Sequence, residues 1–295
     1  MAGFITRLFS RSTNGPGKRP AARASAAPVV PPPAGPAAPP PSPPAQTVAA
    51  PPAAPAQELS RRLPKGLGVF RWGPESGYAI DVIVVLCHGM GSNGENIIQI
   101  APKFGTVVRR ALFVAPNGPL EGTDGAGGRA WFDARDRRPA ALEVGVRKAA
   151  AALNDVIDSE LARVGLPPDA YALAGYSQGA MTALFTGLRR NPGPRAIFCY
   201  AGALIAPETL GDELANRAPV LLGHGLADTV VPAFYSRDAE RALRAARVPV
   251  QGVYLPGAGH NIDGAGLQAG KDFFRRWLLP EPAQPASARR TLADG

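Results

Sequence analysis

The 295-residue sequence is poor in cysteine and has no long apolar run. Its two cysteines, Cys87 and Cys199, lie inside apolar stretches typical of buried strands, which excludes a disulfide-stabilised scaffold and favours a reducing compartment. No stretch reaches the ~18 apolar residues that a membrane span requires. Residues 1–9 are too short and too polar for the apolar region of a signal peptide. We therefore expect a soluble, cytoplasmic protein without stable membrane insertion.

Aromatic side chains are almost missing from residues 1–60, which hold 15 of the 33 prolines, 15 alanines and only two aromatics, Phe4 and Phe9. Such a segment cannot bury enough apolar surface to offset its ordering entropy. We therefore expect a disordered, basic Pro/Ala-rich arm over 1–62, one globular domain over 63–279 and a loose tail over 280–295. An apolar face on a short helix around Phe4 and Phe9 leaves weak contact with a membrane surface open.

The net charge of +9 raises the question of a nucleic-acid partner, but its distribution argues against one. Five of the cations lie within residues 1–60, where Glu58 is the single acid. The remaining excess is spread over arginine pairs such as 109–110 and 275–276, without the interleaved aromatics that would stack on bases. A solvated basic surface is the simpler interpretation. The nucleic-acid alternative predicts that residues 63–279 bind DNA with an affinity that depends steeply on salt, and we expect no such binding.

Short β-branched runs alternate with longer amphipathic segments along the predicted domain. Residues 79–87 are almost continuously apolar, which predicts a central strand buried on both sides. The other strands are expected at 111–115, 170–174, 196–200, 219–222 and 250–255. The clearest helix spans 139–164, and others are expected at 95–104, 178–190, 233–246 and 267–278. The expected fold class is α/β, with a mostly parallel twisted sheet and helices on both faces.

Residues 175–179 match the pattern G-x-S-x-G, and their context decides what the match is worth. A predicted strand precedes Ser177 directly and a predicted helix follows it, which is the setting of a nucleophile elbow. Side chains at Gly175 and Gly179 would collide in a turn of this kind. An incidental serine in a glycine-rich turn is the alternative. The pattern favours Ser177 as a nucleophile.

A serine hydroxyl needs a base whose second ring nitrogen is held by a carboxylate. His260 lies in a glycine-rich loop after the last predicted strand, and Asp228 follows the strand before it. The order Ser177, Asp228, His260 is the one expected for this architecture. Asp263 is the rival carboxylate, although its position suits the start of the final helix. We therefore predict Ser177, His260 and Asp228 as nucleophile, base and orienting acid.

The two remaining histidines, His88 and His224, each precede a glycine at a predicted strand end, where we expect the ring to bond to nearby backbone. The loop after the first strand also predicts one oxyanion donor, the backbone N–H of Met90, and the second is that of Gln178. Because both donors are main-chain groups, the identity of the side chains at these positions says little about them. Cys87 is expected in the core rather than as a nucleophile.

These residues resemble the carboxylesterase, phospholipase and acyl-protein thioesterase branch of the α/β-hydrolases. The resemblance covers 71–278 and depends on motifs that follow one another in order: LCHGMGSNGEN (86–96), APNGP (115–119), RAWFD (129–133), AGYSQGAM (174–181), HGLADTVVP (224–232) and GAGHNI (257–262). It implies the α/β-hydrolase fold, the same three catalytic residues and the same oxyanion donors. It also implies that the loop with Trp131 and Phe132 lies beside the acyl pocket, where the two rings would be pocket wall or loop anchors. The Pro-rich arm departs from the family pattern.

The sequence thus predicts a serine hydrolase that cleaves carboxylic esters or thioesters without a metal or organic cofactor. Lysophospholipase or acyl-protein thioesterase activity is the finer alternative, so a lipid-like substrate is left open. A non-catalytic binding protein with this fold, whose Pro-rich arm docks a partner domain, is the alternative from another class. A homodimer is also left open.

Overall fold

The computed structural model describes residues 68–74, 79–122 and 128–279. The arm predicted over 1–62 and the tail predicted over 280–295 lie outside the described residues. The boundaries drawn for the three parts of the chain therefore remain predictions.

Seven strands form one sheet in the order β1-β3-β2-β6-β7-β8-β9. β1 runs antiparallel to β3, and the other neighbours in this sheet are parallel. The strands are β1 (Val69–Trp72), β2 (Val82–Cys87), β3 (Ala111–Pro116), β6 (Tyr171–Tyr176), β7 (Ile197–Tyr200), β8 (Val220–Gly225) and β9 (Val250–Leu255). A separate two-stranded ribbon joins β4 (Leu120–Glu121) to β5 (Arg129–Ala130).

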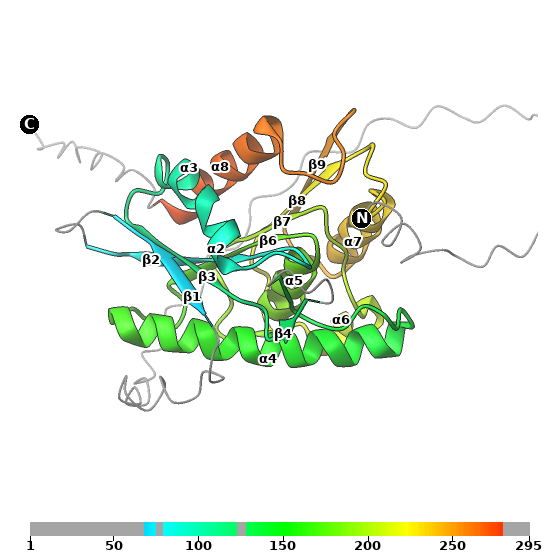
Figure 1. Cartoon of the computed structure of the whole chain (residues 1–295), viewed down its shortest axis with the longest axis horizontal. Helices are drawn as coiled ribbons and strands as arrows, with labels where there is room; N and C mark the ends of the chain where they lie inside the picture. The colour runs from blue at the N-terminus through cyan, green and yellow to red at the C-terminus, as the bar shows by residue number, and fades with distance from the viewer. Residues whose placement is uncertain (1–67, 75–78, 123–127, 280–295) are drawn as a thin grey trace, which may run out of the picture. The chain divides into compact units, whose positions relative to one another are not determined.

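Helices cover both faces of this sheet (Figure 1). On one face pack α4 (Pro139–Val164), α5 (Gln178–Arg189) and α7 (Phe234–Ala245). On the other face pack α2 (Gly94–Ile97), η1 (Ile98–Ile100), α3 (Ala101–Gly105) and α8 (Gly264–Leu278). The short η2 (Pro207–Thr209) and α6 (Leu210–Glu213) follow β7. The expected α/β architecture is confirmed.

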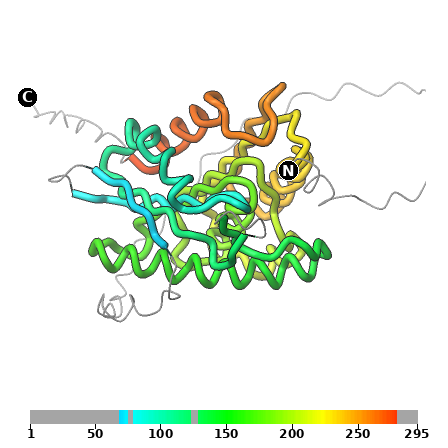
Figure 2. Tube along the Cα trace, viewed as in Figure 1, coloured from blue at the N-terminus to red at the C-terminus, as the bar shows by residue number. Residues whose placement is uncertain are grey.

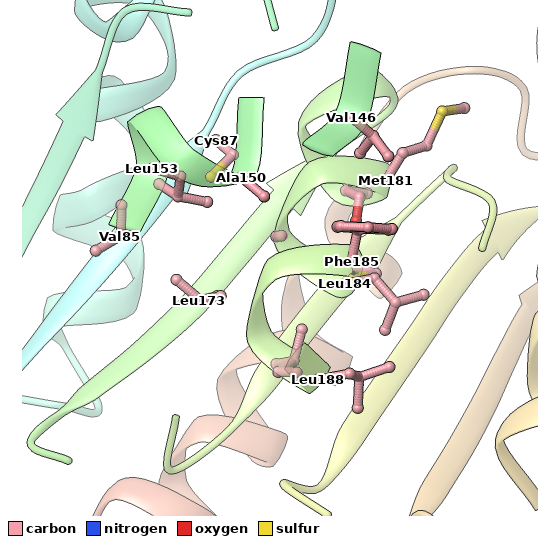
Figure 3. Packing of buried hydrophobic residues seen from close by; sticks show 14 of the residues in the cluster. Val85, Cys87, Val146, Ala150, Leu153, Leu173, Met181, Leu184, Phe185 and Leu188 are labelled. Atoms are coloured by element: carbon pink, nitrogen blue, oxygen red, sulfur yellow. Dashed lines mark hydrogen bonds between the residues drawn. The ribbon is translucent and has the colours of Figure 1, made fainter. Parts of the chain in front are cut away.

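β2 shows why its apolar run is unbroken. Ile83, Val85 and Cys87 contribute to the cluster under α4 and α5, whereas the alternate residues contribute to the cluster under α3 and α8. A strand covered on both faces needs apolar side chains at every position. Figure 3 shows the first cluster, in which side chains of β2, α4, α5 and β6 meet, among them Val85, Cys87, Ala150, Leu153, Leu173 and Leu184.

Aromatic rings join segments that are far apart in the sequence. Figure 2 shows the trace of α3 lying beside that of α8. Their contact is an edge-to-face pair, Phe104 with Phe274, whose ring centroids are 5.4 Å apart. Phe198 of β7 packs edge-on against both rings. The final helix is thereby held over the centre of the sheet.

Most element predictions agree with the structure to within a few residues. α4 has the predicted bounds because Pro139 needs no N–H partner in the first turn and Gly165 ends the helix at φ 68°. The single helix predicted over 95–104 was wrong, since the segment divides into α2, η1 and α3. Pro102 explains the break, because it has no N–H to donate to the carbonyl of Ile98. None of the described helices is long and apolar enough to cross a membrane.

Candidate active site

The topology brings the three predicted site residues to one edge of the sheet. β6, β8 and β9 are parallel members of the sheet, so their carboxyl ends lie at the same edge. Ser177 directly follows β6, and Asp228 and His260 lie in the loops after β8 and β9. The two loops are tied together, because the N–H of Ala227 donates to the carbonyl of Ala258 at 2.9 Å.

Ser177 occupies a sharp turn between β6 and α5. Its φ of 54° and ψ of −120° lie in a region that residues other than glycine rarely adopt. Such a conformation costs on the order of 1–3 kcal/mol and persists because surrounding contacts enforce it. Here the Ser177 N–H donates to the backbone carbonyl of Tyr200 at 2.9 Å. A Cβ at Gly175 would collide with the carbonyl of Gly179, and one at Gly179 with the carbonyl of Cys87, so both glycines are sterically required.

A continuous hydrogen-bonded chain links hydroxyl, imidazole and carboxylate. The Ser177 Oγ lies 3.0 Å from Nε2 of His260, and Nδ1 of that ring lies 2.6 Å from Oδ2 of Asp228. Since an ionised carboxylate can only accept, Nδ1 carries the proton and Nε2 presents its lone pair to the hydroxyl. The hydroxyl can therefore pass its proton to the ring without any movement of the backbone.

The carboxylate of Asp228 is fully buried and held from several sides. Its Oδ1 accepts from the N–H groups of Val230 and Val231 at 2.8 and 2.9 Å. Burial alone would raise the pKa of Asp228, but hydrogen bonds from His224, His260 and Val231 outweigh it and hold the pKa well below its usual range. The carboxylate is therefore charged at neutral pH.

Tyr176, which precedes the serine, fixes the histidine loop. Its hydroxyl donates to the carbonyl of His260 at 2.6 Å, and the two ring centroids are 5.1 Å apart. Burial raises the pKa of Tyr176 to about 12, so the phenol stays a donor. The imidazole is 15% exposed and opens on the pocket described below.

The loop after β2 is shaped by His88. Nδ1 of this buried ring lies 2.8 Å from the carbonyl of Gly89, and Nε2 accepts the N–H of Gly118 at 2.8 Å. Both bonds are to backbone, as expected from the sequence. They hold the turn that carries Met90, which lines the pocket together with Gln178. Among the described residues, no backbone carbonyl accepts a hydrogen bond from the N–H of Met90 or from that of Gln178.

Because the neutral ring of His88 is buried, we expect the protein to lose stability in mild acid. Burial lowers the pKa of His88 to about 4; the hydrogen bond with the Gly89 carbonyl opposes this shift, and the charge of Arg129 adds to it. The unfolded chain binds that proton near pH 6.5. The contribution of the neutral His88 ring to the free energy of unfolding is therefore complete above pH 6.5. It is lost as the pH falls to about 4, and the loss is on the order of 3 kcal/mol.

Urea unfolding of the full chain at pH 7, 5.5 and 4.5 measures this effect against His88→Gln. The glutamine keeps an acceptor for Gly118 but does not titrate. We expect the free energy of unfolding of the wild type to fall more steeply than that of the variant. Parallel curves would contradict the assignment.

The side chain of Gln178 has a role that the sequence did not reveal. It is buried, and its Oε1 accepts the N–H of Trp131 while its Nε2 donates to the carbonyl of Phe132, both at 2.8 Å. The Gln178 amide therefore satisfies two backbone groups of this loop, as the backbone of a neighbouring strand would otherwise do. The sequence did not indicate this role, because only tertiary contact shows which groups the amide satisfies.

The side chains of Trp131 and Phe132 have different surroundings. Phe132 lines the pocket. Trp131 is buried behind it, and its indole N–H donates to the carbonyl of His88 at 2.9 Å. Trp131 is thus a loop anchor, one of the two roles expected from the sequence, and its placement in the substrate pocket is corrected because its buried indole is held by His88 and does not line the pocket.

A pocket of about 170 Å³ lies in front of Ser177 and His260. Its polar lining comes from those two side chains, from Gly89 in the loop after β2 and from Gln178 at the start of α5. The rest of the wall is apolar and comes from α4, α5 and three loops, through Phe132, Ala134, Leu142, Met181, Ile205 and Val231. An apolar recess with a few convergent polar groups is typical of a small-molecule site.

Other candidates from the sequence lie away from this chemistry. Asp263 caps α8, accepting the N–H of Gly266 at 2.8 Å. Cys87 and Cys199 are unpaired and buried, and burial raises the pKa of both thiols. In the described part of the chain no three His, Cys, Asp or Glu side chains gather in a way that could hold a metal ion.

The arrangement defines a class of protein. A mostly parallel sheet, with a serine in a strained turn between a central strand and a helix and an imidazole in the loop after the last strand, is the α/β-hydrolase architecture. Residues 77–278 match the family model described as phospholipase/carboxylesterase. The chain belongs to this family and is an enzyme of the hydrolase class.

Individual relatives agree with this assignment. The crystal structure of esterase PE8 is similar at 36% identity and a TM-score of 0.67, covering 72% of this chain and 99% of that one. The acyl-protein thioesterase 1 of Schizosaccharomyces pombe is 28% identical over 167 residues, which is 54% of this chain and 74% of the relative. A probable carboxylesterase of Oryza sativa subsp. japonica is 28% identical over 209 residues, 66% of this chain and 77% of that protein.

Proposed function

We propose that the chain hydrolyses carboxylic esters or thioesters through an acyl-enzyme on Ser177, with His260 as general base and Asp228 as its orienting carboxylate. The observation that carries the proposal is the chain of hydrogen bonds from Ser177 Oγ through the His260 ring to Asp228, at 3.0 and 2.6 Å. The names of the relatives, which include carboxylesterases and acyl-protein thioesterases, support this substrate class.

The proposed reaction proceeds in two halves. The Ser177 Oγ attacks the carbonyl carbon as its proton passes to Nε2 of His260, and the carbonyl oxygen becomes an oxyanion held by the N–H groups of Met90 and Gln178. The imidazolium, stabilised by Asp228, then gives this proton to the departing alkoxide or thiolate. A water molecule, deprotonated by His260, attacks the acyl-enzyme, and collapse of the second oxyanion releases the carboxylic acid and restores the hydroxyl.

A fluorophosphonate probe separates this proposal from a non-catalytic binding protein. The probe reacts covalently with a serine only when a base activates its hydroxyl. We expect the full chain to be labelled and to turn over p-nitrophenyl butyrate, and preincubation with the probe to abolish the turnover. A folded protein that is neither labelled nor active would favour the binding-protein alternative.

The acyl group that fits this pocket is short. The volume of about 170 Å³ is close to that of an engineered apolar cavity of about 150 Å³ that binds benzene. We therefore expect kcat/KM for p-nitrophenyl esters to be greatest at about four to six acyl carbons and to fall by about tenfold or more toward palmitate. A maximum at palmitate would contradict this size limit and favour the lipid-like substrates of the alternative activities.

Met181 and Leu184 provide a matched pair of variants for the size limit. Both side chains are buried on α5, but only that of Met181 lines the pocket. Met181→Ala should move the preferred chain length upward because it enlarges the recess, whereas Leu184→Ala should leave it unchanged. Equal shifts in the two variants would show that the pocket wall does not set the limit.

The compartment and the oligomeric state of the protein were predicted from the sequence. The two buried, unpaired thiols support a reducing compartment such as the cytoplasm. The homodimer stays a prediction.

A further inference from the structure

A second imidazole contacts the carboxylate that orients His260. Nε2 of His224 lies 3.1 Å from Oδ2 of Asp228, the same oxygen that receives the His260 Nδ1 proton. The His224 side chain is fully buried, and so is that of Asp228. Its position four residues before the aspartate, at the end of β8, places the ring behind the carboxylate rather than in the pocket, whose lining does not include it.

The hydrogen-bond partners of His224 determine where its proton lies. Nε2 faces Asp228 Oδ2 and, at 2.7 Å, the carbonyl of Val231. Both neighbours can only accept, so a bare Nε2 would set three lone pairs against one another in a buried site. Nε2 must therefore carry a proton, shared between the carbonyl and the carboxylate.

Ser236 completes the arrangement on the other side of the ring. Its Oγ lies 2.6 Å from Nδ1 of His224 and 3.1 Å from the carbonyl of Gly202, and it is buried in α7. The ring is thus held between α7 and the 228–231 loop, with both nitrogens engaged. Such a ring cannot rotate without breaking buried hydrogen bonds and leaving their partners unpaired, which is unfavourable in a buried site.

We propose that His224 is a positioning residue for the reaction, which donates from Nε2 to Asp228 and Val231 and so fixes the carboxylate that orients His260. This inference rests on the proposed function. Oδ1 of Asp228 is already anchored by two backbone N–H groups, and His224 supplies to Oδ2 a donor in addition to His260. Val231 also lines the pocket, so one ring links the orienting carboxylate to the substrate wall.

Two variants of almost equal shape separate positioning from packing. His224→Gln keeps an N–H near the place of Nε2, whereas His224→Met fills a similar volume without a donor. We expect kcat of the methionine variant to fall by on the order of 10–100-fold with KM within about threefold, the range typical of lost outer hydrogen bonds around a reacting site. The glutamine variant should recover most of that loss. Equal kcat values in the two variants would overturn the proposal.

A spectroscopic measurement on the wild-type protein does not depend on whether the variants fold. The chain has three histidines, so the ring nitrogens of ¹⁵N-histidine-labelled full chain give a simple spectrum. We expect the His224 Nε2 to appear protonated, and a bare Nε2 would overturn the proposal. Ser177→Ala, assayed in parallel, separates the two levels of the account: if it is inactive while the His224 variants match the wild type, only the positioning role fails.

Discussion

Ser177→Ala is expected to lower kcat/KM for p-nitrophenyl esters by on the order of 10⁴ or more. The alanine removes the attacking oxygen and leaves the pocket and the His260–Asp228 pair in place. Because alanine must adopt the same φ of 54°, the strain in the turn is unchanged and the thermal midpoint should hardly move. The measurement is steady-state hydrolysis alongside a thermal melt of the full chain.

Ser177→Gly is the matched control for the backbone at this position. Glycine adopts positive φ without steric cost, so the variant should be as inactive as the alanine but more stable, by roughly 1 kcal/mol or about 2–4 °C. An alanine variant that kept most of the turnover would show that the hydroxyl is not the nucleophile. A glycine variant that melts lower than the alanine would contradict the strain assigned to the turn.

Asp228→Asn is expected to lower kcat by on the order of 10³–10⁴ because it reverses the tautomer of His260. The surroundings dictate how the amide would lie. Its oxygen must face the N–H groups of Val230 and Val231, so its NH₂ group faces Nδ1 of His260. Nδ1 must then accept, Nε2 carries the proton, and the ring can no longer take one from Ser177.

Asp263→Asn provides the control, because this residue is the rival carboxylate near His260. Asparagine is as good an N-cap as aspartate, so α8 should remain capped and activity should be close to that of the wild type. The comparison is made by kcat on one ester at neutral pH. Loss of activity in the Asp263 variant, with activity retained in the Asp228 variant, would exchange the roles assigned to the two carboxylates.

The fold was predictable where the residues of an element have a recognisable apolar or amphipathic pattern. β9 and α4 have the predicted bounds, and the other parallel strands were recognised from their apolar runs. β1 was missed because it is a four-residue edge strand whose last two residues, Arg71 and Trp72, are exposed. Antiparallel edges lack the continuous apolar pattern. The segment of η2 and α6 was also missed, since its anchor is tertiary: Glu213 pairs with Arg147 and Arg189.

The site was predictable to the extent that chain order reveals it. Ser177, Asp228 and His260 each follow a strand, and parallel strands end at one edge, so their meeting could be anticipated. The contact of His224 with Asp228 could not, because a histidine before a glycine at a strand end is equally typical of a structural turn. Nor could the inward amide of Gln178 or the different surroundings of Trp131 and Phe132. Each of these contacts depends on which buried polar groups need a hydrogen-bond partner. Only the packed structure shows which groups those are.

The most direct test is to trap the intermediate. The full chain is mixed with p-nitrophenyl acetate, quenched in acid within the first turnovers, digested and mapped by mass spectrometry. The account predicts one acetyl group, carried by the peptide that contains Ser177 and located on that residue. Acetyl on another side chain, or continued ester hydrolysis with Ser177 unmodified under conditions that trap the acyl-enzyme, would contradict it.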